Sequence, residues 1–146
     1  VSEGRLSSES KSQIQCMMRQ ISELESIGDA CYNLGRTLNR LHMHTKERFT
    51  EEQVKHMHTM VSLVTHSLDV MVNVVNKSIE HQFTDYNVSY NIEHEINNYR
   101  NQLKNQNLQD INDGLYSYQI GVYYMDFISE CEKLGDYVVN VVQATK

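Results

Sequence analysis

Two short segments with the same acidic pattern hold the residues most able to do chemistry. Residues 23–29 read ELESIGD and residues 130–136 read ECEKLGD, so Glu, Glu, Gly and Asp recur at matching places. The match extends to an Ile-Ser pair just before each segment and to Asn33 and Asn140 after them. Such repetition indicates either duplication of a structural unit or two helices that fulfil one role.

In each segment the second glutamate and the aspartate stand four residues apart, as Glu25 with Asp29 and Glu132 with Asp136. On a helix this spacing places both carboxylates on one side, where like charges cost about 0.2–0.5 kcal/mol. Carboxylate oxygens are common metal ligands, so these four residues are candidate ligands of a divalent or transition metal ion. The alternative is that they are solvated or paired acids beside the core, as most helix carboxylates are.

A glycine, Gly28 or Gly135, stands on the apolar stripe between the acids of each segment. Glycine inside a helix costs about 1 kcal/mol relative to alanine. We therefore expect each glycine to permit close approach of another backbone. If the helices that carry the two segments are antiparallel neighbours, both acid pairs lie near the middle of a bundle, where they could share or bracket a metal cluster.

Four amphipathic helices are predicted to position these segments, because apolar residues recur every three or four positions in each. The predicted ranges are about 8–41, 50–83, 85–111 and 117–145. The stripe that the first helix is expected to bury consists of Ile14, Met17, Ile21, Leu24, Gly28, Cys31, Leu34 and Leu38. Helices of similar length with short connections favour antiparallel neighbours.

Local signals mark several helix ends. Residues 50–53, TEEQ, have the form of a capping box that starts the second helix. Asp85 offers an N-cap for the third helix, and Gly114 offers its C-terminal stop.

Composition agrees with a helical chain. The sequence has 146 residues with no proline and six glycines, so helix-breaking residues are scarce. We predict one all-α domain over residues 1–146, an antiparallel up-down-up-down four-helix bundle with long helices, in which residues 1–7 form a flexible leader. This length suits a single core.

The net charge limits the kinds of partner that the chain can bind, and the cysteine content indicates its redox compartment. With 13 Lys and Arg against 19 Asp and Glu, the formal charge is −6, which disfavours binding to nucleic acid. The three cysteines, Cys16, Cys31 and Cys131, lack metal-ligand spacing and predict reduced core thiols in a reducing compartment. The most apolar stretch, residues 68–75, is far shorter than the roughly 20 residues that a membrane span needs.

Other residues able to do chemistry form no convincing site. His42 with His44, and His56 with His58, stand two apart and point about 200° away from each other on a helix. Glu95 is expected on the inward face of the third helix, as an additional ligand or as a paired acid at the edge of the core. Gly-rich phosphate loops, nucleophile elbows and Cys/His dyads are absent, so we predict that the chain is not an enzyme.

The acidic segments resemble the signature of PhoU, the phosphate-signalling protein, whose helices carry an LERIGD-type segment once per three-helix repeat. Further similarity to the C-terminal cytoplasmic tail of bacterial sodium/phosphate cotransporters is carried by residues 95–97 (EIN), Arg100, and residues 124–126 (YMD), 135–137 (GDY) and 140–141 (NV). Three departures are Ser26 and Lys133 in place of the usual arginine, and Cys131 in place of leucine.

The resemblance implies a bundle of long helices of the PhoU or spectrin-repeat kind. It also implies metal ions, such as iron, zinc, manganese or magnesium, held by Glu25, Asp29, Glu132 and Asp136. The first helix would be the last helix of one PhoU-type repeat, and the remaining three helices would form a complete second repeat. The chain would be a cytoplasmic regulatory domain attached to an inner-membrane protein. Its partners would be the membrane region of that transporter or other components of the phosphate system, and we expect a homo-oligomer.

Two other functions fit the same residues. A helical interaction or dimerisation module would keep the acids solvated and bind no metal. A carboxylate-bridged metalloenzyme would need an open coordination position and a substrate pocket.

Overall fold

The computed structural model describes residues 7–146, all of whose regular structure is helical. Its elements are α1 (Ser8–His44), α2 (Glu51–Ile79), α3 (Asn87–Asn112) and α4 (Tyr118–Thr145). The all-α prediction is therefore confirmed, with helix ends within a few residues of those expected. The predicted flexible leader lies, apart from Ser7, outside the described residues.

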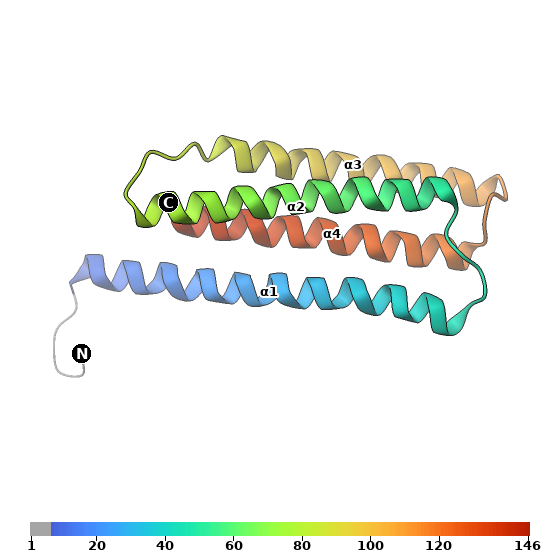
Figure 1. Ribbon diagram of the computed structural model, residues 1–146, viewed down its shortest axis with the longest axis horizontal. Coiled ribbons are helices and arrows are strands. Elements are labelled where there is room, and N and C mark those ends of the chain that lie inside the picture. Colours follow the sequence, from blue (N-terminus) through green and yellow to red (C-terminus); the bar gives the residue numbers. More distant parts are fainter. Residues whose placement is uncertain (1–6) are drawn as a thin grey trace.

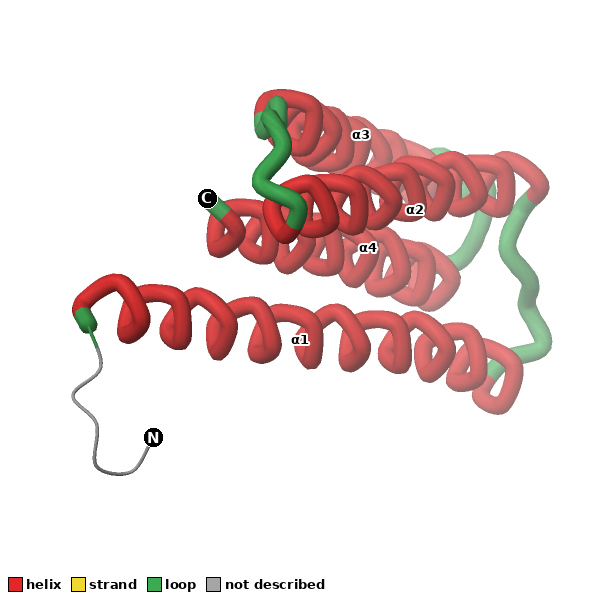
Figure 2. The backbone as a smooth tube through the Cα atoms, turned by 60° about the vertical axis from the view of Figure 1, so that its left-hand side comes forward, coloured by secondary structure: helices red, strands yellow, loops and turns green. Residues whose placement is uncertain are grey.

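The helices run up, down, up and down, as expected (Figure 1). α4 lies among the other three helices and packs against each of them, while α2 and α3 also pack against each other. Within residues 7–146, α1 packs against α4 alone, and Figure 2 shows it standing apart from α2 and α3. The bundle is thus a compact three-helix unit, α2–α3–α4, with α1 attached along one side of α4.

Side-chain caps fix the starts of three helices. The Ser7 and Ser117 hydroxyls accept hydrogen bonds from the backbone N–H groups of Ser10 and Ile120. The capping box predicted at Thr50 and Gln53 is present, with both reciprocal hydrogen bonds formed. Asp85, the predicted N-cap of α3, lies one residue before the N-cap, which is Tyr86. The Asp85 carboxylate still accepts a hydrogen bond from the backbone N–H of Asn87.

The predicted stop at Gly114 is confirmed. Gly114 has φ of 75°, a left-handed conformation that glycine adopts without steric cost. Its N–H donates to the carbonyl of Ile111, and the N–H of Leu115 donates to that of Asp110. These two hydrogen bonds satisfy carbonyls at the C-terminal end of α3 and turn the chain toward α4.

The hydrophobic core is centred on α4. Its side chains at Tyr124, Ile128, Cys131, Leu134 and Val138 are almost completely buried. The same cluster includes Met60 and Val64 from α2, Ile92 and Ile96 from α3, and Ile27 and Ala30 from α1. Residues of all four helices thus share one continuous core.

The expected buried stripe of α1 is largely wrong. Ile14, Met17, Ile21, Leu24 and Leu38 are all exposed, with 63% of Ile21 accessible. The face of α1 that meets α4 instead contains Ile27, Ala30 and the half-buried Leu34. Apolar residues do recur with the helical period along α1, but they form two adjacent rows. The sequence pattern alone does not show which of the two rows meets α4.

The cysteine prediction also needs correction. Cys131 is fully buried, and burial, together with the nearby Glu130 and Cys31, raises its pKa to about 12. Cys16 and Cys31 are exposed rather than buried in the core, because they belong to the part of α1 that α4 does not cover. All three are free thiols.

None of the helices within residues 7–146 combines the length and apolar character needed to cross a bilayer.

Candidate functional site

The two acidic segments lie side by side on α1 and α4, in antiparallel orientation. The Asn140 amide donates a hydrogen bond to the Glu23 carboxylate at 3.2 Å, and the Asn33 amide donates to the Glu130 carboxylate at 3.2 Å. Glu130 follows Glu23 by 107 positions, and Asn140 follows Asn33 by the same number. The duplicated residues therefore exchange equivalent bonds across a local two-fold axis, which we call the Glu–Asn lock.

The Glu–Asn lock fixes how α1 sits on α4. All four of its side chains are partly buried, and each bond joins an ionisable carboxylate to an amide N–H, the stronger class of hydrogen bond. A shift of one helix along the other would break both bonds together. The lock therefore sets the register of the two helices, whereas apolar contacts alone tolerate sliding.

The second acid pair lies between α3 and α4. Glu132 Oε2 is 3.4 Å from Arg100 Nε, and both side chains are about one quarter exposed. Asp136 lies near Glu132 and near Glu93 of α3. Burial, together with the charges of Glu132 and Glu93, raises the pKa of Asp136 from 3.8 to about 6. Asp136 therefore carries a proton well above the pH at which most aspartates lose it.

The first acid pair lies on the outer side of α1. Glu25 and Asp29 are both exposed, and each stands two residues from the buried Ile27. Residues two apart on a helix point about 200° away from each other, so these carboxylates point away from α4. Glu132 and Asp136 have the same relation to the buried Leu134. The pairs reach the same height along the bundle, as expected, but lie on opposite sides of the α1–α4 pair.

This geometry separates the four predicted ligands into two pairs. Within residues 7–146, the structure contains no group of three or more His, Cys, Asp or Glu side chains arranged to hold a metal ion. A single ion between the two pairs is therefore not supported by the arrangement. Glu95, the predicted additional ligand, is exposed, and the acid of α3 that lies near Asp136 is Glu93.

The two motif glycines differ in their surroundings. A Cβ atom at Gly135 would lie 3.2 Å from Cδ1 of Ile96, so α3 packs closely over this position. A Cβ atom at Gly28 would meet nothing within 4 Å in the described structure. Gly135 is thus closely packed, although against a side chain rather than the expected backbone. Gly28 is not closely packed by any described residue.

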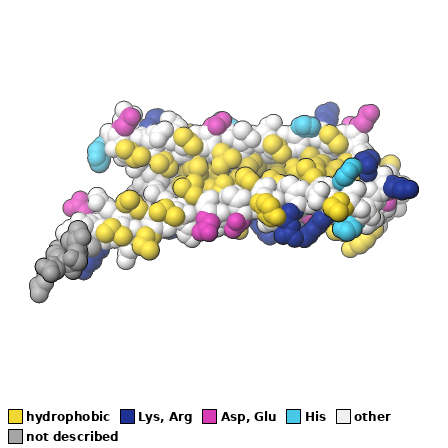
Figure 3. Space-filling model, turned by 60° about the horizontal axis from the view of Figure 1, so that its bottom comes forward, with side chains coloured by type: hydrophobic (Ala, Val, Ile, Leu, Met, Phe, Trp, Pro, Cys, Tyr) yellow, Lys and Arg dark blue, Asp and Glu magenta, His cyan; other side chains and the backbone are white. Residues whose placement is uncertain are grey.

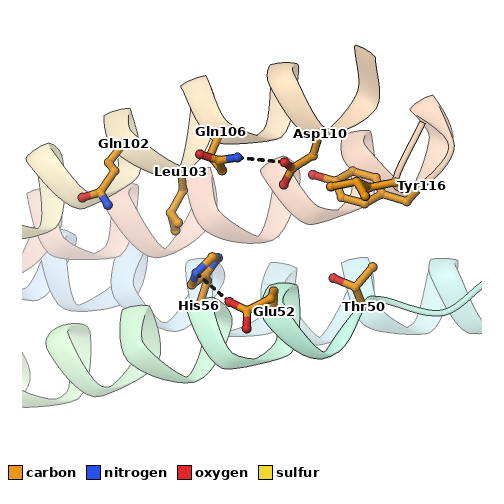
Figure 4. Close-up of a pocket in the computed structure, with 9 residues that line it drawn as sticks. Thr50, Glu52, His56, Gln102, Leu103, Gln106, Asp110 and Tyr116 are labelled. Atoms are coloured by element: carbon orange, nitrogen blue, oxygen red, sulfur yellow. Dashed lines mark hydrogen bonds and ion pairs between the residues drawn. The ribbon is translucent and has the colours of Figure 1, made fainter. Parts of the chain in front are cut away.

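A cavity of about 510 Å³, lined mainly by polar residues, lies between α2 and α3 at the end of the bundle where α1 connects to α2 (Figure 4). His56 contacts Glu52 at 3.7 Å, and across the cavity Gln106 donates to Asp110 at 2.8 Å. The cavity is lined by Thr50, Glu52, His56, Gln102, Leu103, Gln106, Asp110, Leu115 and Tyr116. Sequence reasoning missed it because its residues come from α2, α3 and the connection to α4.

Tyr116 lines this cavity, Tyr124 lies beside the lining residue His56, and neither tyrosine is suited to act as a base. Burial and Asp110 raise the pKa of Tyr116 to about 12, and burial raises the pKa of Tyr124 still more. The Tyr116 hydroxyl donates to Asn107 at 2.7 Å, and the Tyr124 hydroxyl lies 3.2 Å from His56 Nδ1. These contacts satisfy buried polar groups, and the cavity lacks an activated nucleophile.

Neither a family model, nor a curated protein, nor a solved structure matches this chain. The similarity to PhoU-like domains therefore depends on the motif residues of the sequence itself.

The Glu–Asn lock predicts a measurable coupling between α1 and α4. Replacing Glu23 or Asn140 by alanine should each lower the free energy of unfolding by about 1 kcal/mol, the usual net contribution of one intramolecular hydrogen bond. The double variant should cost about 0.5–1 kcal/mol less than the sum of the two single variants. Urea unfolding of the four proteins measures this coupling. As a control, Glu25→Ala with Asn140→Ala should be additive, and additivity in the Glu23 cycle as well would contradict the lock.

Asp136 predicts an unusual dependence of stability on pH. Its pKa is higher in the folded chain than the unfolded value of 3.8, so its contribution to stability is complete below about pH 4 and is lost as the pH rises through about 6. Asp136→Asn should therefore raise the free energy of unfolding by about 1 kcal/mol at about pH 7.5, allowing for solvent screening, and by little at about pH 4.

Asp29 provides the matched control, because it occupies the equivalent position of the other segment and is exposed. Asp29→Asn should change stability by less than about 0.5 kcal/mol at either pH. Denaturant unfolding at both pH values measures these differences. An equal response of the two variants would contradict the raised pKa of Asp136.

Proposed function

We propose that this chain is a cytoplasmic regulatory module of a phosphate-uptake system, which acts through helix packing rather than covalent chemistry. The observation that carries the proposal is the antiparallel pairing of the two motif copies through the Glu–Asn lock. The resemblance to PhoU-like domains rests on the same two segments. Their direct contact gives the duplication a physical role, since each copy supplies the partner of the other.

The packing of the helices supports the same proposal. α2, α3 and α4 form a compact unit whose last helix carries one copy of the motif, and α1 carries the other copy on a helix that, within residues 7–146, packs against α4 alone. This division matches the one that the resemblance implies, in which α1 belongs to one three-helix repeat and the other helices form a second. On this proposal the natural partner is the membrane region of a transporter or another component of the phosphate system.

The mobile element in this mechanism is α1. Beside the Glu–Asn lock it meets α4 through apolar residues and through polar contacts such as Gln20 to Thr145 at 2.9 Å. Because α1 has one neighbour among the described helices, it can move without breaking the contacts among α2, α3 and α4. A partner that binds one position of α1 better than another would shift the population of the module toward that position.

The proposal is tested by phosphate uptake in cells that produce the whole protein containing this chain. Deleting residues 7–44, which carry one copy of the motif, should leave uptake of radiolabelled phosphate insensitive to a change from low to high external phosphate. Replacing Leu108 by alanine, an exposed change on α3, should leave the response intact. Equal responses in the deletion strain and its parent would contradict a role in phosphate regulation.

A helical interaction module without metal is the second candidate, and the separation of the two acid pairs favours it. Each pair supplies two carboxylates, so a bound ion would need further ligands from water or a partner. Metal bound at the motif should disappear in a Glu25→Ala/Asp136→Ala double variant, which elemental analysis of the purified proteins detects. Equal metal content, or none in either protein, would leave regulation by packing alone.

A further inference from the structure

A hollow of about 300 Å³ lies between α1 and α4, beside the half of the Glu–Asn lock that Asn33 and Glu130 form. Three basic side chains line it, Arg36 and Arg40 from α1 and Lys133 from α4. Figure 3 shows Lys and Arg side chains gathered in one group beside α1, along the lower edge of the view. A chain with a formal charge of −6 thus brings three cations together at one place.

The two arginines of this hollow have hydrogen-bond donors to offer. Arg36 and Arg40 are exposed and stand four apart, so both leave the same side of α1. Within residues 7–146, neither guanidinium forms an ion pair with a carboxylate. A guanidinium presents its N–H groups as a planar fork that matches the oxygen atoms of phosphate. The Ser129 hydroxyl of α4 adds a neutral donor, so the lining suits a small oxyanion.

Two carboxylates also line the hollow, and they decide which oxyanion fits. Glu130 is compensated, because it accepts from the Asn33 amide and lies 3.8 Å from Lys133 Nζ. Asp126 is exposed and, among the described residues, has no ion pair. An ionised carboxylate accepts a hydrogen bond from a P–OH group but repels an anion that carries no proton. Near neutral pH phosphate retains a proton and sulfate does not, so Asp126 favours phosphate.

The internal repeat separates these cations from the Glu–Asn lock. A shift of 107 positions relates Lys133 to Ser26 and Arg36 to Gln143, so the other half of the lock has neutral residues where the hollow has cations. That half forms its carboxylate–amide hydrogen bond at the same distance of 3.2 Å. The cations are therefore not required to join α1 to α4, and they leave the hollow with one net positive charge.

We propose that this hollow binds a hydrogen phosphate ion. Arg36 and Arg40 donate to its oxygen atoms, and Asp126 accepts the hydrogen bond of its P–OH group. The ion bridges α1 and α4, so its binding favours the position of α1 in which the lock is formed. The binding depends on the hollow alone, whereas its use as a regulatory signal rests on the proposed function.

The phosphoryl group of a small ester presents similar oxygen atoms, but it fits Asp126 less well. The second pKa of a phosphomonoester is about 6, so at about pH 7.5 most ester groups carry no P–OH donor. Free phosphate loses its corresponding proton at a higher pH and retains the donor more often. The hollow therefore favours free phosphate over its esters.

NMR titration of the complete chain at constant ionic strength tests the site. Inorganic phosphate should shift the side-chain Nε–H signals of Arg36 and Arg40, with a dissociation constant on the order of 1 mM, and leave that of Arg19 unchanged. Sulfate and glycerol 3-phosphate should each bind more weakly, sulfate by about tenfold. Equal shifts of all three arginines, or no shift, would overturn the site. Tighter binding of glycerol 3-phosphate would overturn the assignment to free phosphate.

Removal of the two arginines should abolish most of the affinity. Arg36→Gln/Arg40→Gln should raise the dissociation constant for phosphate by about tenfold or more, because it removes the charge-assisted hydrogen bonds. The matched control is Arg19→Gln, which removes an exposed arginine of α1 that does not line the hollow. This control should bind like the parent chain, and both variants should retain its helix content. Equal weakening by the two variants would indicate a general effect of charge and overturn the proposal.

Asp126→Asn tests the choice of anion. The amide removes the repulsion yet can still accept from P–OH, so sulfate should bind about as well as phosphate, while the affinity for phosphate changes less. Equal changes in the affinities for both anions would overturn the role of Asp126 as the acceptor.

Phosphate uptake in cells separates this inference from the proposed function. In the whole protein, Arg36→Gln/Arg40→Gln should make uptake insensitive to external phosphate, as deletion of residues 7–44 should. Normal regulation in this variant, together with loss of regulation in the deletion, would overturn the hollow as the sensor and leave the proposed function standing. Binding by the purified chain without any effect of the deletion would support the hollow and contradict the proposed function.

Discussion

α4 depends on the other three helices for its burial, and the rest of the structure follows from this requirement. Its apolar residues extend around so much of the helix that a single neighbour could not cover them. α2 and α3 cover one face and α1 covers another. Because hydrophobic burial supplies most of the favourable free energy of folding, this arrangement also decides where polar groups can be placed. The carboxylates lie at the edges of the α4 interfaces, where water or an amide can reach them.

The seam between α1 and α4 shows how an apolar interface acquires a unique register. A row of small and aliphatic side chains can pack in several positions with similar burial, but a pair of reciprocal hydrogen bonds is complete in one position only. Glu23 with Asn140, and Asn33 with Glu130, provide that pair at the middle of the seam. The duplication is thus visible in the structure as two-fold related contacts, in which each copy completes the other.

Identical motif residues acquire different chemistry from their neighbours. Asp29 and Asp136 occupy the same place in the repeat, yet Asp29 is exposed on α1 and Asp136 lies beside Glu93 and Glu132 at the α3–α4 interface. Desolvation and like charges disfavour the ionised form, so the pKa of Asp136 is raised to about 6. The same difference applies to the glycines, since Gly135 is packed under Ile96 and Gly28 is open. The copy of the motif on α4 is covered by α3, and the copy on α1 presents the equivalent residues to solvent.

The sequence alone determined four antiparallel helices, the capping box at Thr50, the stop at Gly114 and the repeat of the acidic motif, because periodicity, caps and repeats are local properties of the chain. It also placed Asn33 and Asn140 in the repeat, although their hydrogen bonds to Glu130 and Glu23 were not foreseen. The tertiary structure decided which of two apolar rows of α1 is buried, which of Cys16, Cys31 and Cys131 lies in the core, and that the acid pairs lie on opposite sides of the α1–α4 pair. Helical periodicity defines faces but not neighbours. The side on which a neighbour packs depends on contacts between residues far apart in the chain, such as Asn33 with Glu130.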